Sequence, residues 1–317
     1  MAKEPESIHR TSIGGQAVME GVMMRGPREI ATAVRKSSGE IVVDKRPVSS
    51  VITRYKILKL PIIRGCISFF ESLVIGVKSL MYSADQYDLE DGEEAYQPSK
   101  FEDWLDRKFG DKIKDIAIYA SVVIALILGV ALFMLLPNVI VGLFDNIVTS
   151  SVARNLLEGV LRLGIFLAYM LLVSRMKDIQ RVFEYHGAEH KTIACYEHGM
   201  ELTPENAKTF SRLHPRCGTS FLLIVMVISI IVFSFLRWGP AWERLLLRLV
   251  LLPVVAGVSY EVIKIAGRSQ NRVVQLLTKP GLWLQHLTTR EPDESQLEVA
   301  ITALKNVLTG NKEEDKW

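Results

Sequence analysis

The stretch IAIYASVVIALILGVALFMLL, residues 116–136, decides the fold class, because it runs for 21 residues without a charged side chain. A helix rises about 1.5 Å per residue, so a helix of this length crosses the roughly 30 Å hydrocarbon core of a bilayer. The stretch TSFLLIVMVISIIVFSFL, residues 219–236, has the same character. Residues 156–173 and 245–265 are also apolar but carry a few charges, which can reach the membrane surface along their stems. The sequence therefore predicts about four transmembrane helices.

The distribution of lysine and arginine predicts how these helices are oriented. Basic residues are sparse in residues 137–155 and 237–244 and are concentrated in residues 176–218 and in both terminal segments. Because cytoplasmic loops carry the excess of basic residues, we expect a multi-pass protein of the cell membrane whose termini and middle loop face the cytoplasm. The expected partner is the lipid bilayer, and no protein partner is indicated. A net charge of +3, mixed in sign, argues against nucleic acid as the main partner.

The polar segments divide the rest of the chain. Residues 1–50 predict a β-rich element, because residues 30–35 and 40–45 have the pattern of a hairpin. Residues 51–83 predict an amphipathic helix, for which a position on the membrane surface is favoured over insertion or re-entry. The other segments are an acidic linker with a short helix (84–115), transmembrane helices one and two (116–175), a cytoplasmic loop (176–218), helices three and four (219–265), and C-terminal helices broken at residues 279–281 (266–317). The predicted fold class is a mainly α, polytopic membrane bundle with a small N-terminal β element.

Four of the six histidines fall in the predicted cytoplasmic loop. His186 and His190 are four residues apart, so on a helix their rings project from one face and could bind one cation. With Glu189 they form the string His-x-x-Glu-His, which occurs in a class of metalloenzymes. His214 and Cys217 add a second ligand-like pair, and mixed imidazole and thiolate ligands favour zinc among divalent metals. The alternative explanation is a surface helix with two solvated histidines.

The number of ligands separates two kinds of protein. If all four of these imidazole and thiol groups bind, zinc is tetrahedral and closed, and the site is structural. If only three groups bind, a position stays open for water, and zinc lowers the pKa of that water toward about 7. Glu189 would then accept the proton of the water. Glu197 is a further candidate ligand.

A glycine-rich string, GGQAVMEGVMMRGP, occupies residues 14–27. It lacks the signature of a phosphate-binding loop and that of a dinucleotide site, so the simplest explanation is a tight turn into the sheet. Alternatively, Gln16, Glu20 and Arg25 could contribute polar side chains to the site on the cytoplasmic side.

Four motifs, in this order, resemble the YqhQ-like family of bacterial membrane proteins: GGQAVMEGVMMRGP, YHGAEHKTIACYE, HPRCGTSF and TREPDESQLEVAITAL. The resemblance extends from about Ser12 to about Leu308. It implies a multi-span membrane protein with a suspected metal site, in a family of unknown function that is described as a predicted metal-dependent enzyme. The matching positions are Glu20, Arg25, His186, Glu189, His190, Glu197, His214, Arg216, Cys217, Glu291, Asp293 and Glu298.

These observations support three hypotheses of different classes. The first is a membrane-embedded, cytoplasm-facing, metal-dependent hydrolase that uses a metal-bound water, with Glu189 as general base and Arg216 stabilising developing negative charge. The second is a membrane scaffold or assembly factor with a structural zinc site. The third is a transporter, which would depend on Glu158 or Glu261 inside the spans.

Overall fold

The computed structural model describes residues 9–317 except residues 54, 87–111, 145 and 269–270. Most of the linker and short helix expected at residues 84–115 therefore lies outside the described residues. The chain divides into two compact units. The first unit comprises residues 1–88, 169–229 and 251–317, and the second comprises residues 89–168 and 230–250.

The first unit is built on a four-stranded antiparallel sheet with the strand order β1-β2-β3-β4. Its strands are β1 (Gly14–Val18), β2 (Gly21–Arg25), β3 (Glu29–Arg35) and β4 (Ile41–Pro47). The expected small N-terminal β element is thus confirmed, with the predicted hairpin as β3 and β4. The glycine-rich string forms the other hairpin, in which Val18 pairs with Gly21 across the turn Met19–Glu20.

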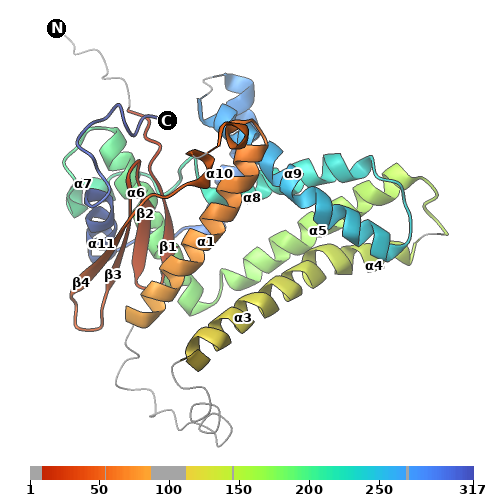
Figure 1. The fold of residues 1–317 in the computed structure, drawn as a ribbon, viewed down its shortest axis with the longest axis horizontal. Helices are drawn as coiled ribbons and strands as arrows, with labels where there is room; N and C mark the ends of the chain where they lie inside the picture. Colours follow the sequence, from red (N-terminus) through yellow and green to blue (C-terminus); the bar gives the residue numbers. More distant parts are fainter. Residues whose placement is uncertain (1–8, 54, 87–111, 145, 269–270) are drawn as a thin grey trace, which may run out of the picture. The chain divides into compact units, whose positions relative to one another are not determined.

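The two faces of this sheet are covered by different helices, because successive side chains of a strand point to opposite faces. One face packs on α6 (Lys177–Glu197) and α11 (Glu294–Lys305), as Figure 1 shows. The fully buried sheet residues of this core are Val22, Met24, Ala31 and Ala33. The other face packs on α1 (Ile63–Gln86), where the hydroxyls of Thr32 and Ser79 are 3.2 Å apart and hydrogen-bonded.

Helix α1 continues beyond the sheet and packs on a second long helix, α9 (Ala241–Arg268). Gly65 permits the close approach, because a Cβ there would lie 2.9 Å from the Gly257 carbonyl oxygen. The Arg64 guanidinium also donates to the Glu261 carboxylate, with an Nε–Oε1 distance of 2.7 Å. The positive charge at the start of α1 is therefore neutralised by α9.

The remaining elements of the first unit connect the sheet to the helices. They are η1 (Val51–Thr53), η2 (Lys56–Lys59), α7 (Pro204–Lys208), α10 (Arg272–Thr288) and the larger part of α8 (Gly218–Ser234). The expected break at residues 279–281 is wrong, because α10 continues through Pro280. Gly281 lets α10 approach α8, since a Cβ at Gly281 would lie 2.7 Å from the Ser220 hydroxyl.

The second unit is a helical bundle with a buried cluster of charges. It contains α3 (Lys112–Val130), the π-helical segment η3 (Ala131–Leu135), α4 (Leu136–Gly142) and most of α5 (Ser151–Val173). Glu158 Oε1 accepts hydrogen bonds from Arg162, at 2.7 Å, and from Arg248. Arg248 also donates to the Asn155 carbonyl at 3.1 Å. All four side chains are buried, so this polar cluster is fully enclosed by apolar helices.

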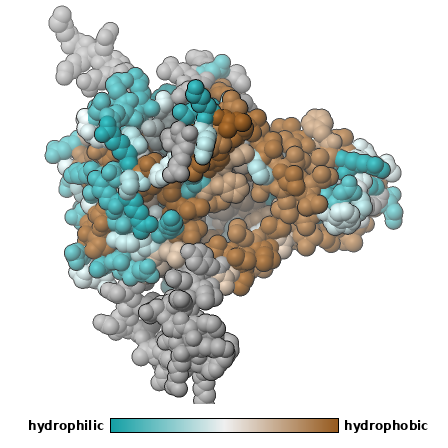
Figure 2. Space-filling view, in the orientation of Figure 1, coloured by the Kyte–Doolittle hydropathy of each residue, from teal (hydrophilic) through white to brown (hydrophobic). Residues whose placement is uncertain are grey.

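Among the described residues, four helices are long and apolar enough to cross a membrane: Ile63–Gln86, Ala120–Gly142, Ser151–Val173 and Ala241–Gly267. Three of them coincide with expected spans. The fourth expected span is the apolar but shorter helix Gly218–Ser234. Helix α1, for which the sequence favoured a position on the membrane surface, is also long and apolar enough to cross a membrane. Figure 2 shows the apolar surface that these helices present and the more hydrophilic surface around the sheet.

Candidate metal centre

Helix α6 positions the two histidines of the His-x-x-Glu-His string on one side of its axis. The rings of His186 and His190 have centroids 4.4 Å apart. His186 Nδ1 lies 2.8 Å from the Thr288 carbonyl oxygen, and His190 Nδ1 lies 2.6 Å from the Arg212 carbonyl oxygen. A carbonyl oxygen only accepts, so in each histidine Nδ1 carries a proton and Nε2 is the nitrogen that could bind a metal. Metal-binding histidines are commonly oriented by this kind of outer hydrogen bond.

Cys217 brings a sulfur atom to the same point from the loop that precedes α8. Its Sγ lies 3.2 Å from His186 Nε2, and one ligand atom from each of His186, His190 and Cys217 lies within 4.8 Å of the others. Two ligands at zinc distances, about 2.0–2.3 Å from the ion and at a tetrahedral angle, are about 3.5 Å apart. His186 Nε2 and Cys217 Sγ already lie near this separation, and the three groups could hold one ion if their ligand atoms moved closer together.

The environment of Cys217 favours its thiolate. The thiol is buried, and burial by itself raises a thiol pKa, but hydrogen bonding to His190 and the charge of that ring outweigh burial and lower the pKa of Cys217. The Thr219 backbone N–H also donates to Sγ at 3.3 Å. For His190, burial and the neighbouring His186 lower the pKa. The lowered pKa of Cys217 favours the thiolate, which is the form of a thiol that binds metals.

Glu189 lies at the same cavity and faces the sheet. Its Oε1 accepts a hydrogen bond from the Gly15 backbone N–H at 2.9 Å, whereas its buried Oε2 has no hydrogen-bond partner among the described residues. Burial raises the pKa of Glu189 to about 7, although the charge of His186 and the Gly15 N–H oppose this. A carboxyl group with a pKa near neutrality can both accept and release a proton.

His214, Arg216 and Glu197 form a separate group beside the three ligands. The Glu197 carboxylate accepts hydrogen bonds from Arg216 and from the Thr11 backbone N–H, the latter at 2.7 Å. Its Oε2 lies 3.5 Å from His214 Nε2. The structure thus brings His214 and Glu197 together but does not place either of them in the three-ligand group. The His214 ring nevertheless lies close, with its centroid 5.5 Å from that of His190.

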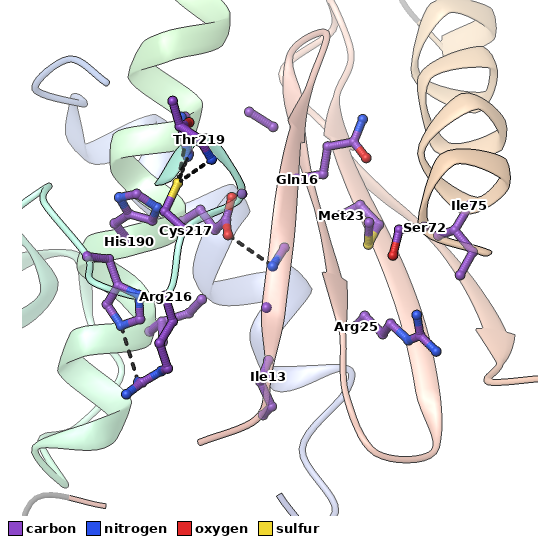
Figure 3. A pocket seen from close by; sticks show the side chains of 18 of the residues that line it. Ile13, Gln16, Met23, Arg25, Ser72, Ile75, His190, Arg216, Cys217 and Thr219 are labelled. Carbon is purple, nitrogen blue, oxygen red and sulfur yellow. Dashed lines mark hydrogen bonds between the residues drawn. The ribbon is translucent and has the colours of Figure 1, made fainter. Parts of the chain in front are cut away.

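All of these groups except Glu197 line one cavity of about 510 Å³, which is large enough for a small ligand. Figure 3 shows His190, Arg216 and Cys217 on one side and the strands with α1 on the other. The lining residues singled out by the sequence are Gln16, Arg25, His186, Glu189, His190, His214, Arg216 and Cys217. Glu20 is not among them, because it forms an ion pair with Arg181 and accepts a hydrogen bond from Tyr185 at 3.1 Å.

Several residues of the cavity could not be foreseen from the sequence. The Gly15 N–H donates a hydrogen bond to Glu189, which is 174 positions away in sequence, and Ser72 and Ile75 line the cavity from α1. Gly15 carried a partial signal, since a glycine pair within a strand often marks a close approach of another group. No local pattern marked Ser72 or Ile75, because their role depends on how α1 packs on the sheet.

Comparison with known proteins identifies the family of this chain. A family model described as a protein of unknown function, DUF1385, matches residues 60–310. The chain is 35% identical over 300 residues to the uncharacterized protein YqhQ of Bacillus subtilis (strain 168), and the alignment covers 93% of this chain and 92% of that protein. No solved structure matches the chain. The resemblance drawn from the four motifs is thus confirmed, and the chain belongs to the DUF1385 family of proteins of unknown function.

Proposed function

We propose that the protein is a membrane-embedded, metal-dependent enzyme, and specifically a hydrolase. The observation that carries the proposal is the convergence of His186, His190 and Cys217 beside a Glu189 oxygen that has no hydrogen-bond partner among the described residues. Three protein ligands are typical of catalytic zinc, which keeps a further position open, whereas four are typical of structural zinc.

The chemistry of the three groups supports zinc as the metal. Two imidazoles and one thiolate are a ligand set suited to zinc and less suited to calcium or magnesium, which prefer oxygen. Both imidazoles present Nε2, and the pKa of Cys217 is lowered. A bound zinc ion would supply a strongly acidified water molecule for the attack on a substrate.

Glu189 and Arg216 have the remaining roles in this proposal. Glu189 is the general base, because its Oε2 is buried at the cavity and accepts no hydrogen bond from the part of the chain that the structure describes. Arg216 lines the cavity beside Glu197 and stabilises negative charge that develops on the substrate. The ion pair with Glu197 holds the guanidinium in place.

The Glu189→Gln variant provides the decisive test, because it keeps the shape of the side chain and removes its basicity. Under the proposal, the purified variant holds as much zinc as the wild type but has lost hydrolytic turnover by about 100-fold or more. Glu184→Gln is the matched control, since Glu184 lies on α6 and hydrogen-bonds to Gln296 instead of facing the cavity. Both quantities are measured on the same preparation, with zinc determined by mass spectrometry.

Two outcomes would count against the enzyme. If the wild type holds no zinc at stoichiometric level after metal-free purification, the site is not a metal centre. If Glu189→Gln loses zinc, then Glu189 is a fourth ligand and the site is closed. That second result would favour the scaffold with structural zinc, for which the free Glu189 oxygen is the supporting observation.

For the cellular location, we propose the cell membrane, with several spans and with both termini and the 176–218 loop in the cytoplasm. The four apolar helices and the basic residues of that loop support this arrangement. Single cysteines at Ser37 and Ser150 test it by labelling intact cells with an impermeant maleimide, in a variant that lacks Cys66 and keeps the buried Cys195 and Cys217. We expect the reagent to label only the Ser150→Cys variant. Labelling of the Ser37→Cys variant instead would show that the orientation is the opposite of the proposed one.

A further inference from the structure

The strand β1 has a free edge beside the candidate metal centre. It is the first strand in the order β1-β2-β3-β4, so only β2 pairs with it in the sheet. Residues just before it are already paired, since Thr11 bridges to Lys316 and the Ser12 N–H donates to the Asp315 carbonyl. The unpaired stretch therefore begins at β1 itself.

The register shows which main-chain groups of β1 point outward. Val18 and Gly21 flank a two-residue turn and form a hydrogen-bonded pair, so the hydrogen-bonded positions of β1 are residues 14, 16 and 18. The N–H and C=O groups of Gly15 and Ala17 then point away from β2. The hydrogen bond from the Gly15 N–H to Glu189 agrees with this direction.

Three of these outward groups lack a partner. In the described part of the chain, no hydrogen bond engages the Gly15 carbonyl or either main-chain group of Ala17. Gly15, Gln16 and Ala17 nevertheless line the 510 Å³ cavity together with the candidate ligands. A row of unpaired N–H and C=O groups is the template that an extended peptide needs in order to add a strand.

We propose that an extended peptide binds along the free edge of β1, with its main chain hydrogen-bonded to Gly15 and Ala17. That this peptide is also the substrate rests on the proposed hydrolase. Water then adds across the amide: a new C–O bond forms, the C–N bond breaks, and Glu189 passes a proton of the water to the leaving amine. Each product keeps one terminus of the peptide.

The edge favours a peptide over a lipid-derived substrate. An acyl chain has no groups that could satisfy an amide N–H and two carbonyl oxygens, whereas a peptide main chain offers donors and acceptors in alternation. Because Glu189 occupies the Gly15 N–H at the end of the free stretch, a peptide on Gly15 and Ala17 runs directly to the general base.

The test is a binding experiment that does not depend on turnover. Full-length Glu189→Gln protein, loaded with zinc in phosphatidylcholine nanodiscs, is used to select binders from a pool of random nonapeptides. The tightest peptide is then resynthesised with single N-methyl groups along its length. Because a strand alternates between bonded and free N–H groups, methylation should weaken binding by about tenfold at every second central residue and have little effect between.

A matched pair of proline variants places the peptide on β1. Ala17→Pro removes an outward N–H without breaking a bond to β2, and it should abolish selection of the peptide. Lys45→Pro makes the same change on β4, the other edge strand, where the register also points the N–H outward. This variant should bind the selected peptide as tightly as the protein without a proline substitution. Zinc content and melting temperature are measured for both variants. If Ala17→Pro does not fold, the N-methyl series still decides the question.

The outcomes separate this inference from the hydrolase. Alternating sensitivity to N-methylation supports the inference even if the wild type does not cleave the peptide, a result that would refute only the hydrolase. Uniform sensitivity along the peptide, or no selection of any peptide, overturns the inference. Glu189-dependent cleavage of p-nitrophenyl octanoate without peptide binding overturns it as well and leaves the hydrolase standing.

Discussion

Cys217 is the residue that turns a pair of histidines into a candidate metal centre. Loss of an outer-shell partner alone lowers metal affinity by about 10–100-fold, so loss of the thiol should have at least that effect. We therefore expect Cys217→Ser to lose at least about 90% of its bound zinc, measured by mass spectrometry after gel filtration. Cys195→Ser is the control, because Cys195 is buried in the hydrophobic core and donates a hydrogen bond to the Glu201 carbonyl, at 3.5 Å, without belonging to the candidate centre. Full zinc content in Cys217→Ser would remove the thiol from the centre.

Two neighbouring glycines differ sharply in how much space surrounds them. A Cβ at Gly15 would lie 2.5 Å from the Met23 carbonyl oxygen and 2.9 Å from Glu189 Cδ, whereas a Cβ at Gly14 would meet nothing within 4 Å. Gly15→Ala should therefore lower the free energy of unfolding by about 1–3 kcal/mol and displace Glu189. Gly14→Ala should change it by less than about 0.5 kcal/mol. Denaturant titration compares the two, and equal effects would mean that the contact with Glu189 is not made.

At the residue scale, the sequence predicted what depends on local spacing. The four-residue interval between His186 and His190 indicated a shared face, and the structure gives ring centroids 4.4 Å apart. The pairing of the His214 and Glu197 side chains, and that of the Gly15 N–H with the Glu189 carboxylate, join residues 17 and 174 positions apart in sequence. No periodicity encodes such contacts, because they are set by the packing of α6 and its neighbouring loop.

Helix α11 begins with a capping box. The Asp293 carboxylate accepts a hydrogen bond from the Gln296 N–H at 2.9 Å, and the Gln296 side chain accepts one from the Asp293 N–H at 3.0 Å. Asp293→Ala should destabilise the first unit by about 0.5–2 kcal/mol. Glu294→Ala, which removes an exposed ion pair with Lys208 and leaves the capping box in place, is the control. Thermal melting measures both, and equal melting temperatures would refute the cap.

The same cap predicts a dependence on pH. Burial acts to raise the pKa of Asp293, but hydrogen bonds from Ser295 and Gln296 outweigh it and lower the pKa below the usual value. A lowered pKa in the folded state stabilises the protein at pH values above the unfolded pKa of about 3.9, and this stabilisation is lost as the pH falls through the folded pKa. The difference in stability between wild type and Asp293→Ala should therefore shrink below about pH 4.

At the element scale, the sequence predicted long apolar helices well and interruptions badly. The apolar runs gave three of the candidate spans, because length and composition alone define them. The break expected at Pro280 does not occur, since α10 continues through that residue and packs Gly281 against Ser220. The sequence did not predict the β1–β2 hairpin, because its strands lie in a glycine-rich string and glycine has a low strand propensity. Pairing with β2 outweighs that low propensity.

The molecule contains two compact units, and each is stabilised internally by different interactions. Glu158 in the second unit forms ion pairs with both Arg162 and Arg248, and all three side chains are buried. Removing one partner of a buried ion pair leaves an uncompensated charge and costs about 3–5 kcal/mol. Glu158→Gln should therefore destabilise the second unit by that amount, whereas Glu243→Gln, at an exposed position of the same unit, should have little effect.

The candidate centre lies wholly in the first unit, so metal removal and Glu158→Gln should affect different parts of the chain. A metal that binds only the folded state stabilises it by about 2.7 kcal/mol at a concentration 100 times its dissociation constant. Chelation should thus accelerate amide exchange in α6 and β1 and leave residues 151–168 unchanged. Glu158→Gln should do the reverse. Hydrogen exchange read by mass spectrometry measures both units at once. Acceleration in both units after either treatment would show that the molecule unfolds as one cooperative body, because a local loss of stability then spreads through the whole chain.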